Sequence, residues 1–292
     1  MGTGIFSGHE VTKEMGQVPI WVISLPRSVE RRANVSACMQ AAGLDFEFFD
    51  AFDGRSLSAP QLSSLYDEKK AILNVGRPLS FGEIGCSLSH LALYEKLLAS
   101  DAPYALIMED DIEFSKDILQ VLSRTALFPE NWDVVHLSWE HGQTSLLNRI
   151  RLTSRYKMVR FIFHSWGSYA YLVGRRAAAR MLEAGRPVIV PPDHLPQGLK
   201  SAGLAIFGID PVCVMLNQEL AFDPKFNTLA ADRFKLQDAA GQRSITAMTL
   251  KKVSWLAKLR LLKRRLDDTP KRWAQGMRWP SANSTSPANI PL

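Results

Sequence analysis

The sequence predicts an α/β domain built around a largely parallel β-sheet. Apolar runs rich in β-branched and aromatic residues alternate with segments whose apolar residues recur at helical spacing, a pattern typical of this class. Turn signals such as Pro26 and the pair Asp53-Gly54 separate them. With 46% hydrophobic and 22% charged residues, the 292-residue chain has a globular composition and is long enough for one large domain or two small ones.

The first half of the chain is expected to contain three strands and three helices. The run VPIWVISL predicts a buried strand, and the apolar spacing after Ser28 predicts a helix that Gly43 closes. Ser80 is a candidate N-cap with Glu83 at the capping-box position, so a helix is expected to begin at residue 81. The expected strands are 18–25, 46–52 and 104–108, and the expected helices are 28–44, 81–99 and 115–125.

The second half continues this alternation. The expected strands are 133–138, 159–163, 169–173 and 212–216, and the expected helices are 175–184 and 194–202. The predicted organisation is one α/β domain at 15–245, a basic segment at 246–279 and a Pro/Ser/Asn-rich, disordered C-terminus at 280–292.

The positive charge of the chain is concentrated near its C-terminus. The whole sequence carries +6, whereas residues 251–279 contain ten basic and two acidic side chains, so the remainder is slightly acidic. A high pI is therefore no indication that the α/β domain binds nucleic acid, and no nucleic-acid partner is expected.

Residues 251–266 predict a basic amphipathic helix. Trp255, Leu259, Leu262 and Leu266 form an apolar stripe flanked by lysines, which is typical of helices that lie on an anionic membrane. The alternative is a helix packed on the α/β domain with its basic face in solvent. The sequence shows neither a membrane-spanning run nor a secretory signal, and its three cysteines are widely spaced. These features favour a cytoplasmic protein held peripherally at the inner membrane.

Three consecutive carboxylates follow an apolar strand in YALIMEDDIEF. Because side chains alternate along a strand, Glu109 and Asp111 are expected on one side and Asp110 on the other. Ligands of open α/β sheets bind at the carboxyl ends of strands, where this cluster lies. Two hard oxygen ligands on one face suit Mg²⁺ or Mn²⁺ carrying a diphosphate. The alternative is a solvated acidic turn.

Arginines gather after the first expected strand, in ISLPRSVERR. Arg27, Arg31 and Arg32 are candidates for phosphate contacts near the start of the following helix. No glycine fingerprint accompanies them, so neither a Rossmann nor a P-loop site is indicated. The alternative is a charged helix face that contacts only solvent.

The helix expected at 81–99 places Glu83, Cys86 and His90 on one face. Buried structural roles are the ordinary expectation for this cysteine and this histidine. Ser89 and His90 are not expected to form a nucleophilic pair, because adjacent helical positions point apart.

Small and polar residues also accompany the later strands. Gly167 and Ser168 precede the strand at 169–173 and are small enough for a ligand to approach. Asp193 is a candidate helix N-cap, and Glu219 follows the strand at 212–216.

Together these segments resemble glycosyltransferase family 25, the bacterial lipooligosaccharide-biosynthesis transferases related to collagen galactosyltransferase domains. The resemblance covers about residues 18–222 and preserves the order of the motifs. They are V-I-S-L-x-R-x-x-x-R-R at 22–32, F-F-D-A at 48–51, G-E-I-G-C-x-x-S-H at 82–90, E-D-D at 109–111, G-S-x-A-Y-L-V at 167–173, P-x-D at 191–193 and Q-E-L at 218–220. The resemblance implies a GT-A-like single domain and inverting transfer of a hexose, commonly galactose, from a UDP-sugar.

The resemblance also implies roles for individual residues. Glu109 and Asp111 match the DxD-type element and are the expected ligands of Mn²⁺ or Mg²⁺. Asp193 is the expected catalytic base, with Glu219 as the other candidate. Pro26 departs from the family motif and removes one N–H donor at its corner. The residues expected on the nucleotide-sugar side are Ser24, Leu25, Arg27, Arg32, Asp50, Ala51, Ser89, His90 and Asp110.

The implied acceptor is a lipopolysaccharide-core or lipooligosaccharide glycan at a membrane surface that the basic segment would contact. Alternatives are a transferase of UDP-glucose or another UDP-hexose to a different glycan, and a non-catalytic saccharide-binding relative. A metal-dependent phosphohydrolase would need further ligands, and the six histidines show no H-x-H or H-x-x-x-H spacing.

Overall fold

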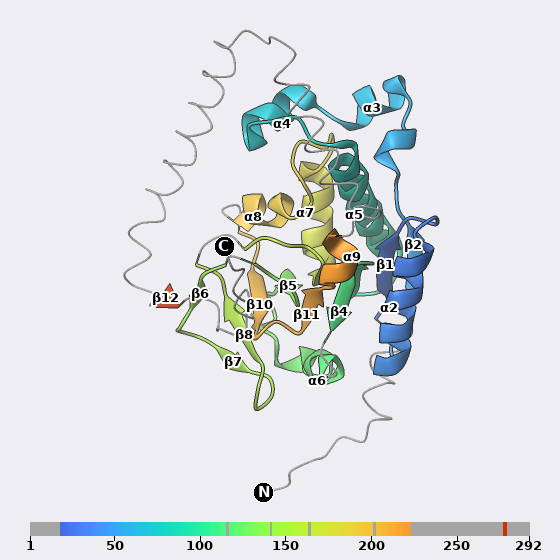
Figure 1. Cartoon of the computed structure of the whole chain (residues 1–292). Coiled ribbons are helices and arrows are strands. Elements are labelled where there is room, and N and C mark those ends of the chain that lie inside the picture. The colour runs from blue at the N-terminus through green and yellow to red at the C-terminus, as the bar shows by residue number, and fades with distance from the viewer. Residues whose placement is uncertain are drawn as a thin grey trace, which may run out of the picture.

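The computed structural model describes residues 18–114, 117–140, 142–162, 165–200, 203–222 and 277–278. At the centre lies an eight-stranded sheet in the order β2-β1-β3-β9-β5-β10-β8-β7 (Figure 1). Its strands are β1 (Ile20–Ser24), β2 (Glu47–Asp50), β3 (Tyr104–Glu109), β5 (Val134–His136), β7 (Ile150–Arg151), β8 (Lys157–Arg160), β9 (Ala170–Gly174) and β10 (Ile206–Asp210). Two small sheets pair β4 (Ile112–Phe114) with β11 (Val214–Leu216) and β6 (Thr144–Ser145) with β12 (Met277–Arg278).

Most strands of the large sheet run in one direction. β1 is parallel to β2 and β3, and β10 is parallel to β5, whereas β9 is antiparallel to both β3 and β5. β8 is antiparallel to β10 and to β7. Only β8 and β9 among these eight strands therefore oppose the common direction, which confirms the predicted α/β class with a mostly parallel sheet. Because β9 is reversed, its amino end meets the carboxyl ends of β3 and β5.

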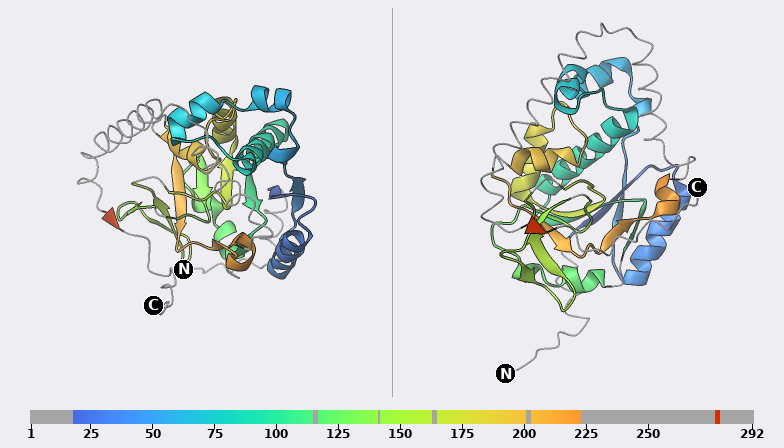
Figure 2. Two further views of the ribbon diagram at one scale, coloured as in Figure 1. Left: turned by 45° about the horizontal axis from the view of Figure 1, so that its top comes forward. Right: turned by 60° about the vertical axis from the view of Figure 1, so that its left-hand side comes forward.

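Helices cover both faces of the large sheet (Figure 1 and Figure 2). Trp21 and Ile23 of β1 belong to the core formed with α5 and α7, while Ile20 and Val22 belong to the opposite core formed with α2 and α6. The helices are α2 (Val29–Ala42), α3 (Ala59–Leu65), α4 (Glu68–Val75), α5 (Phe81–Ala99), α6 (Ile118–Leu122), α7 (Arg175–Ala184), α8 (His194–Lys200) and α9 (Gln218–Phe222), with 3-10 turns η1 (Gly54–Ser56) and η2 (Thr125–Leu127).

Helix α5 begins where the sequence predicts. The N–H of Glu83 donates to Ser80 Oγ at 3.2 Å, and the N–H of Ser80 donates to Glu83 Oε2 at 2.9 Å. These reciprocal bonds are the predicted capping box, and they satisfy two backbone donors at the start of the helix. The Glu83 carboxylate also forms an ion pair with Arg77 at 2.7 Å, so its role is to stabilise the N-terminus of α5.

One expected strand lies outside the large sheet, and one buried strand of that sheet has no counterpart among the expected ones. The strand predicted at 212–216 is β11, which pairs with β4 outside the large sheet. Strand β10, fully buried between β5 and β8, was not predicted. Its sequence IFGID contains Gly208, which weakens the strand signal, although a Cβ there would lie 2.4 Å from the Phe161 ring. The close approach of Phe161 explains why glycine occupies this strand.

The predicted amphipathic helix at 251–266 and the predicted boundaries of the three regions lie outside the described residues. Within the predicted basic segment, Met277–Arg278 form strand β12, which pairs with β6. In the part of the chain that the structure describes, no helix is long and apolar enough to cross a membrane. The three cysteines, Cys38, Cys86 and Cys213, are free thiols, as their spacing predicts.

Candidate active site

The three consecutive carboxylates, here called the acidic turn, lie at the sheet edge where the parallel strands end. β3 ends at Glu109, Asp110 and Asp111 follow, and β4 begins at Ile112. Since the strand ends at Glu109, the alternation expected for the three side chains does not extend to Asp111. Asp110 and Asp111 instead share one cation, Arg31, while Glu109 lies close to His90.

Arg31 of α2 joins the acidic turn to other elements. Its Nη1 lies 3.1 Å from Asp110 Oδ1 and 3.3 Å from Asp111 Oδ2. Its Nη2 donates to the carbonyl of Leu220 on α9 at 3.0 Å, and Ser24 Oγ donates to Asp110 Oδ2 at 2.6 Å. Arg31, a sequence candidate for phosphate contact, is thus paired with the protein's own carboxylates and is only 14% exposed.

Two more nucleotide-side residues meet at the end of β1. Arg32 Nη2 donates to the Ser24 carbonyl at 3.0 Å and forms an ion pair with Asp50. The Ala51 N–H donates to the same Ser24 carbonyl at 3.0 Å. These bonds hold the ends of β1 and β2 together, and the Asp50 side chain stays 71% exposed at the open edge.

Leu25 and Arg27 lie in the turn between β1 and α2. The Ser28 N–H donates to the Leu25 carbonyl at 2.9 Å, with Pro26 at the second position of the turn, where its fixed φ is favourable. Arg27 Nη1 lies 2.6 Å from Asp53 Oδ2, and this hydrogen bond lowers the pKa of Asp53. The loss of a donor at Pro26 therefore leaves this turn intact.

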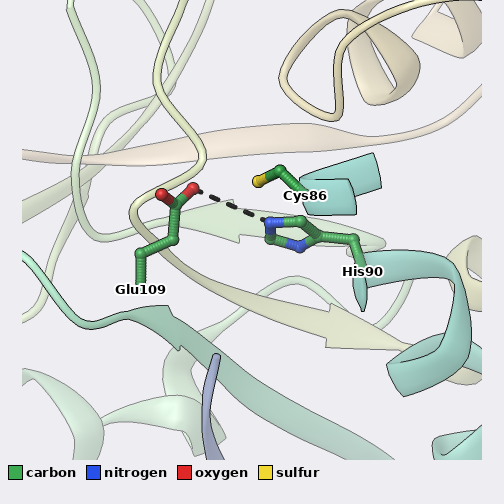
Figure 3. Close-up of side chains that lie close together, drawn as sticks. All are labelled: Cys86, His90 and Glu109. Carbon is green, nitrogen blue, oxygen red and sulfur yellow. Dashed lines mark ion pairs between the residues drawn. The ribbon is translucent and has the colours of Figure 1, made fainter. Parts of the chain in front are cut away.

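Glu109 faces a buried group on α5 (Figure 3). Its Oε1 lies 3.7 Å from His90 Nε2, and the Cys86 sulfur completes a cluster whose ligand atoms lie within 4.8 Å of one another. His90 Nδ1 lies 2.7 Å from the Tyr171 hydroxyl on β9, which lies 2.8 Å from the Tyr94 hydroxyl. Burial lowers the pKa of His90 to about 4, so the imidazole is neutral at pH 7.

Burial also raises the pKa values of two carboxyls in the acidic turn. The pKa of Glu109 rises to about 8, first through desolvation and then through the negative charges of Asp110 and Asp193. The pKa of Asp111 rises to about 7, again mainly through desolvation, with Glu109 as the next cause. Positive charge nearby favours the ionised forms, so a divalent cation would compensate the burial.

The donor set fits a hard cation. Glu109 and Asp111 supply carboxylate oxygens, and Asp111 Oδ1 is a buried acceptor without a hydrogen-bond partner among the described residues. Burial raises the pKa of the Cys86 thiol well above the ordinary value, which favours the neutral thiol over the thiolate. Mn²⁺ or Mg²⁺ at Glu109 and Asp111 stays a prediction, and the residues present fit it.

Asp193 lies in the turn just before α8 and acts on the same cluster. Its negative charge contributes to the raised pKa values of Glu109 and Cys86 and opposes the lowered pKa of His90. The fold therefore brings Asp193 into electrostatic reach of the acidic turn, although about eighty residues separate them in sequence.

Glu219 has different surroundings. It is exposed on the short helix α9, where its N–H donates to Asn217 Oδ1 at 3.1 Å. The Asn217 N–H donates to the Asp111 carbonyl at 2.8 Å, so α9 is tied to the acidic turn through the backbone. Glu219 is not among the charges that mainly shift the pKa values of Glu109 and Asp111.

Ser89 is buried and engaged by the protein. Its Oγ donates to the Gly85 carbonyl at 2.8 Å and accepts from the Phe52 N–H at 2.9 Å. It therefore anchors the loop after β2 to α5. His90, its neighbour, instead contacts Tyr171, and the two side chains form no nucleophilic pair, as predicted.

The segment before β9 also reaches the acidic turn. The Glu109 N–H donates to the Tyr169 carbonyl at 2.8 Å, and Ser168 forms a side-chain hydrogen bond with Glu109. Gly167 has a φ of 88°, and a Cβ there would lie 2.9 Å from the Tyr169 ring, so this turn requires glycine. The small residues Gly167 and Ser168 indicate from the sequence that a ligand can approach. No sequence signal indicates that Ser168 bonds Glu109 or that Tyr171 bonds His90.

A sequence profile of glycosyltransferase family 25 (LPS biosynthesis protein) matches residues 17–196. The chain belongs to this family. The matched region includes Ser24, His90, the acidic turn and Asp193, and it ends before Glu219.

The relatives of this family 25 chain are named for different activities. It is 29% identical over 170 residues to the lacto-N-neotetraose biosynthesis glycosyltransferase LgtE of Neisseria meningitidis, covering 56% of this chain and 59% of that protein. It is 29% identical over 130 residues to human procollagen galactosyltransferase 2, covering 44% and 20%. It is 30% identical over 135 residues to a probable inactive glycosyltransferase 25 family member 3 of Rattus norvegicus, covering 42% and 23%. The matches thus span between about a fifth and three fifths of these relatives' lengths.

Proposed function

We propose that this family 25 chain is a metal-dependent transferase that passes galactose from UDP-galactose to a lipopolysaccharide-core or lipooligosaccharide acceptor. The main support is that the acidic turn, Arg31 and Asp193 converge at one edge of the sheet in a chain of this family. A procollagen galactosyltransferase and LgtE among the relatives support the donor sugar and the acceptor class.

Glu109 and Asp111 would hold the Mn²⁺ or Mg²⁺. A cation bound there supplies positive charge that stabilises the diphosphate as it leaves. Arg31, within 3.3 Å of both Asp110 and Asp111, keeps these carboxylates together and adds a second positive charge at the same edge. Ser24 fixes Asp110 from the other side through its 2.6 Å hydrogen bond.

Asp193 is the proposed catalytic base. As the acceptor oxygen forms a bond to the anomeric carbon, the bond from that carbon to UDP breaks, and Asp193 takes the hydroxyl proton. Its charge acts on Glu109 and His90, and it is not one of the proposed metal ligands, whose oxygens the cation would occupy. Glu219, exposed on α9, is the other candidate for this role.

A non-catalytic saccharide-binding function is the second candidate. A rat relative described as probable inactive raises it, since family membership alone does not guarantee turnover. The raised pKa values of the largely buried carboxyls Glu109 and Asp111 favour the catalytic alternative, because strongly perturbed carboxyls cluster at functional sites.

We further propose that the chain works at the cytoplasmic face of the inner membrane. The support is the sequence pattern of residues 251–279, whose lysines and arginines each contribute about 1 kcal/mol of attraction to an anionic surface. A lipid-linked acceptor would be presented at this surface.

The test is UDP release from a panel of UDP-sugars, with and without a lipooligosaccharide acceptor, Mn²⁺ and excess EDTA. We expect release to be fastest with UDP-galactose, acceptor and Mn²⁺ together. Full release in EDTA would reject the metal. Release from no donor under any condition would favour the non-catalytic alternative.

A further inference from the structure

A pocket distinct from the acidic turn is lined by residues of α4, α7 and α8. Figure 1 shows where these three helices lie. Its volume is about 200 Å³, below the ~300–1,000 Å³ of drug-sized ligand sites, so it suits one small ring. The polar and aromatic side chains that line it are Asn74 of α4, Trp166 before β9, and His194 and Gln197 of α8.

The chemistry of these walls fits a neutral ring that carries hydroxyls. Trp166 is 36% exposed and its ring centroid lies 4.4 Å from that of His194, so an aromatic surface is presented on one side. Asn74 supplies an amide group, which donates and accepts hydrogen bonds, whereas the Gln197 amide is 4% exposed and its Nε2 already donates to Ser165 Oγ at 2.9 Å. None of the described residues that line this pocket is Asp, Glu, Lys or Arg, which disfavours a phosphate or a nucleotide there.

A cavity of about 10 Å³, the size of one water, lies between the pocket and His90. That cavity is lined by His90 and Pro192 and shares the walls Ile189, Val190 and Leu195 with the larger pocket. His90 in turn lies 3.7 Å from Glu109. A continuous set of side chains therefore links the pocket to the acidic turn.

Two segments of the chain contribute residues both to the pocket and to the candidate active site. Trp166 lines the pocket, and Ser168, two residues later, bonds Glu109. His194 lines the pocket, and Asp193, the residue before it, acts on Glu109 and His90. A sugar held by Trp166 and His194 would thus contact the two chain segments that also carry Ser168 and the proposed base Asp193.

We propose that this pocket is a subsite for one neutral hexose unit of the acceptor saccharide, with the ring packed on Trp166 and its hydroxyls bonded to the Asn74 amide. The inference rests on the proposed function, which it deepens by assigning the acceptor a place. Trp166 is a binding residue here and takes no part in bond making.

The experiment uses the full chain and three probe sugars: lactose, N-acetylglucosamine and methyl β-D-galactoside. Sugar binding is measured by saturation-transfer NMR without donor, and the acceptor KM is measured with UDP-galactose and Mn²⁺. We expect at least one probe to bind, and Trp166→Ala to weaken that binding and raise the acceptor KM roughly tenfold, with kcat and UDP affinity unchanged. Trp166→Phe, which keeps an aromatic face, should give sugar binding and an acceptor KM between those of the original protein and Trp166→Ala. The backbone bonds between Trp166 and Glu140, at 2.8 and 2.9 Å, remain possible in both variants.

Leu127→Ala, which trims a side chain 47% exposed on η2, is the control and should change neither measurement. Binding of no probe sugar, equal binding by Trp166→Ala, or an equal loss in the control would overturn the subsite. If Trp166→Ala loses sugar binding while no donor releases UDP, the subsite stands and the transferase function fails. If transfer occurs with an acceptor KM that Trp166→Ala leaves unaltered, the function stands and the subsite fails.

Discussion

The acidic turn separates two regions of opposite electrostatic character. On one side, Asp110 and Asp111 lie within 3.3 Å of Arg31, and Asp110 also accepts from Ser24. On the other side, Glu109 faces His90, which is neutral at pH 7, and no Lys or Arg among the described residues pairs with it. We call Ser24, Arg31, Asp110 and Asp111 the Arg31 region. Glu109, His90 and Tyr171 form the His90 region.

The difference shows that neighbouring carboxyls acquire their chemistry from what surrounds them. In the Arg31 region a fixed guanidinium supplies positive charge. In the His90 region burial raises the pKa of Glu109 to about 8, so either a proton or a divalent cation must balance it. This imbalance is the reason for the proposal that Glu109 and Asp111 together hold a divalent cation.

The largest expected effect is that of Asp111→Ala, which removes the proposed metal ligand that lies beside Arg31. Turnover should fall to background and Mn²⁺ affinity roughly tenfold or more, because one of two proposed ligands is lost. The fold should persist, since the Asp111 carbonyl still accepts from Asn217. Calorimetric Mn²⁺ titration, UDP release and circular dichroism measure these effects. Glu113→Ala, at an exposed carboxylate on β4, is the matched control, and normal UDP release by Asp111→Ala would reject the ligand assignment.

Asp193→Asn tests whether Asp193, whose charge acts on the His90 region, is the base. Turnover should fall roughly 10²–10⁴-fold, the range for a lost general base, while UDP-galactose binding stays near normal. Glu219→Gln, on exposed α9, should keep most turnover. Steady-state kinetics and a donor-binding assay separate the two steps. If Glu219→Gln loses turnover and Asp193→Asn keeps it, the roles are reversed.

Arg31→Ala should destabilise the fold by about 3 kcal/mol, near the lower end for breaking a buried ion pair. Arg31 is 14% exposed and its removal leaves Asp110 and Asp111 close together without a cation. Arg27→Ala is the matched control, because Arg27 is 53% exposed and such pairs contribute about 0–1 kcal/mol. Urea denaturation measures both. Equal losses of stability in the two variants would show that the Arg31 ion pairs contribute no more than an exposed ion pair.

The smallest effect concerns a second neutral histidine beside the His90 region. His136 of β5 packs on the Tyr171 ring, and burial lowers its pKa from 6.5 to about 4. As pH falls below 6.5 the unfolded chain takes up a proton that the folded chain does not, so stability is lost between pH 6.5 and 4, by about 2 kcal/mol between pH 7 and pH 5. His136→Phe should flatten this decline, measured by urea denaturation at pH 7 and pH 5. Parallel pH profiles for the two proteins would contradict it.

Elements with a local cause were predictable from the sequence. The capping box at Ser80 and Glu83 fixes the start of α5, and the apolar run before Glu109 predicts β3 and the position of the acidic turn. The family resemblance added Asp193 to the candidate site. Strand β10 was missed because Gly208 interrupts a short apolar run. The strand β3 ends at Glu109, two residues before Asp111, so strand alternation by itself does not place the Asp111 side chain.

The sequence by itself determined the α/β class, the sheet edge with its three carboxylates and the family of the chain. Only the tertiary structure decided what each carboxylate meets. Ser24 bonds Asp110 across 86 positions, and the reversal of β9 brings Tyr171 to His90 across 81. These pairings depend on strand order, which no local pattern encodes. The raised pKa values of Glu109 and Asp111 depend on burial and on distant charges, which exist only once the chain has folded.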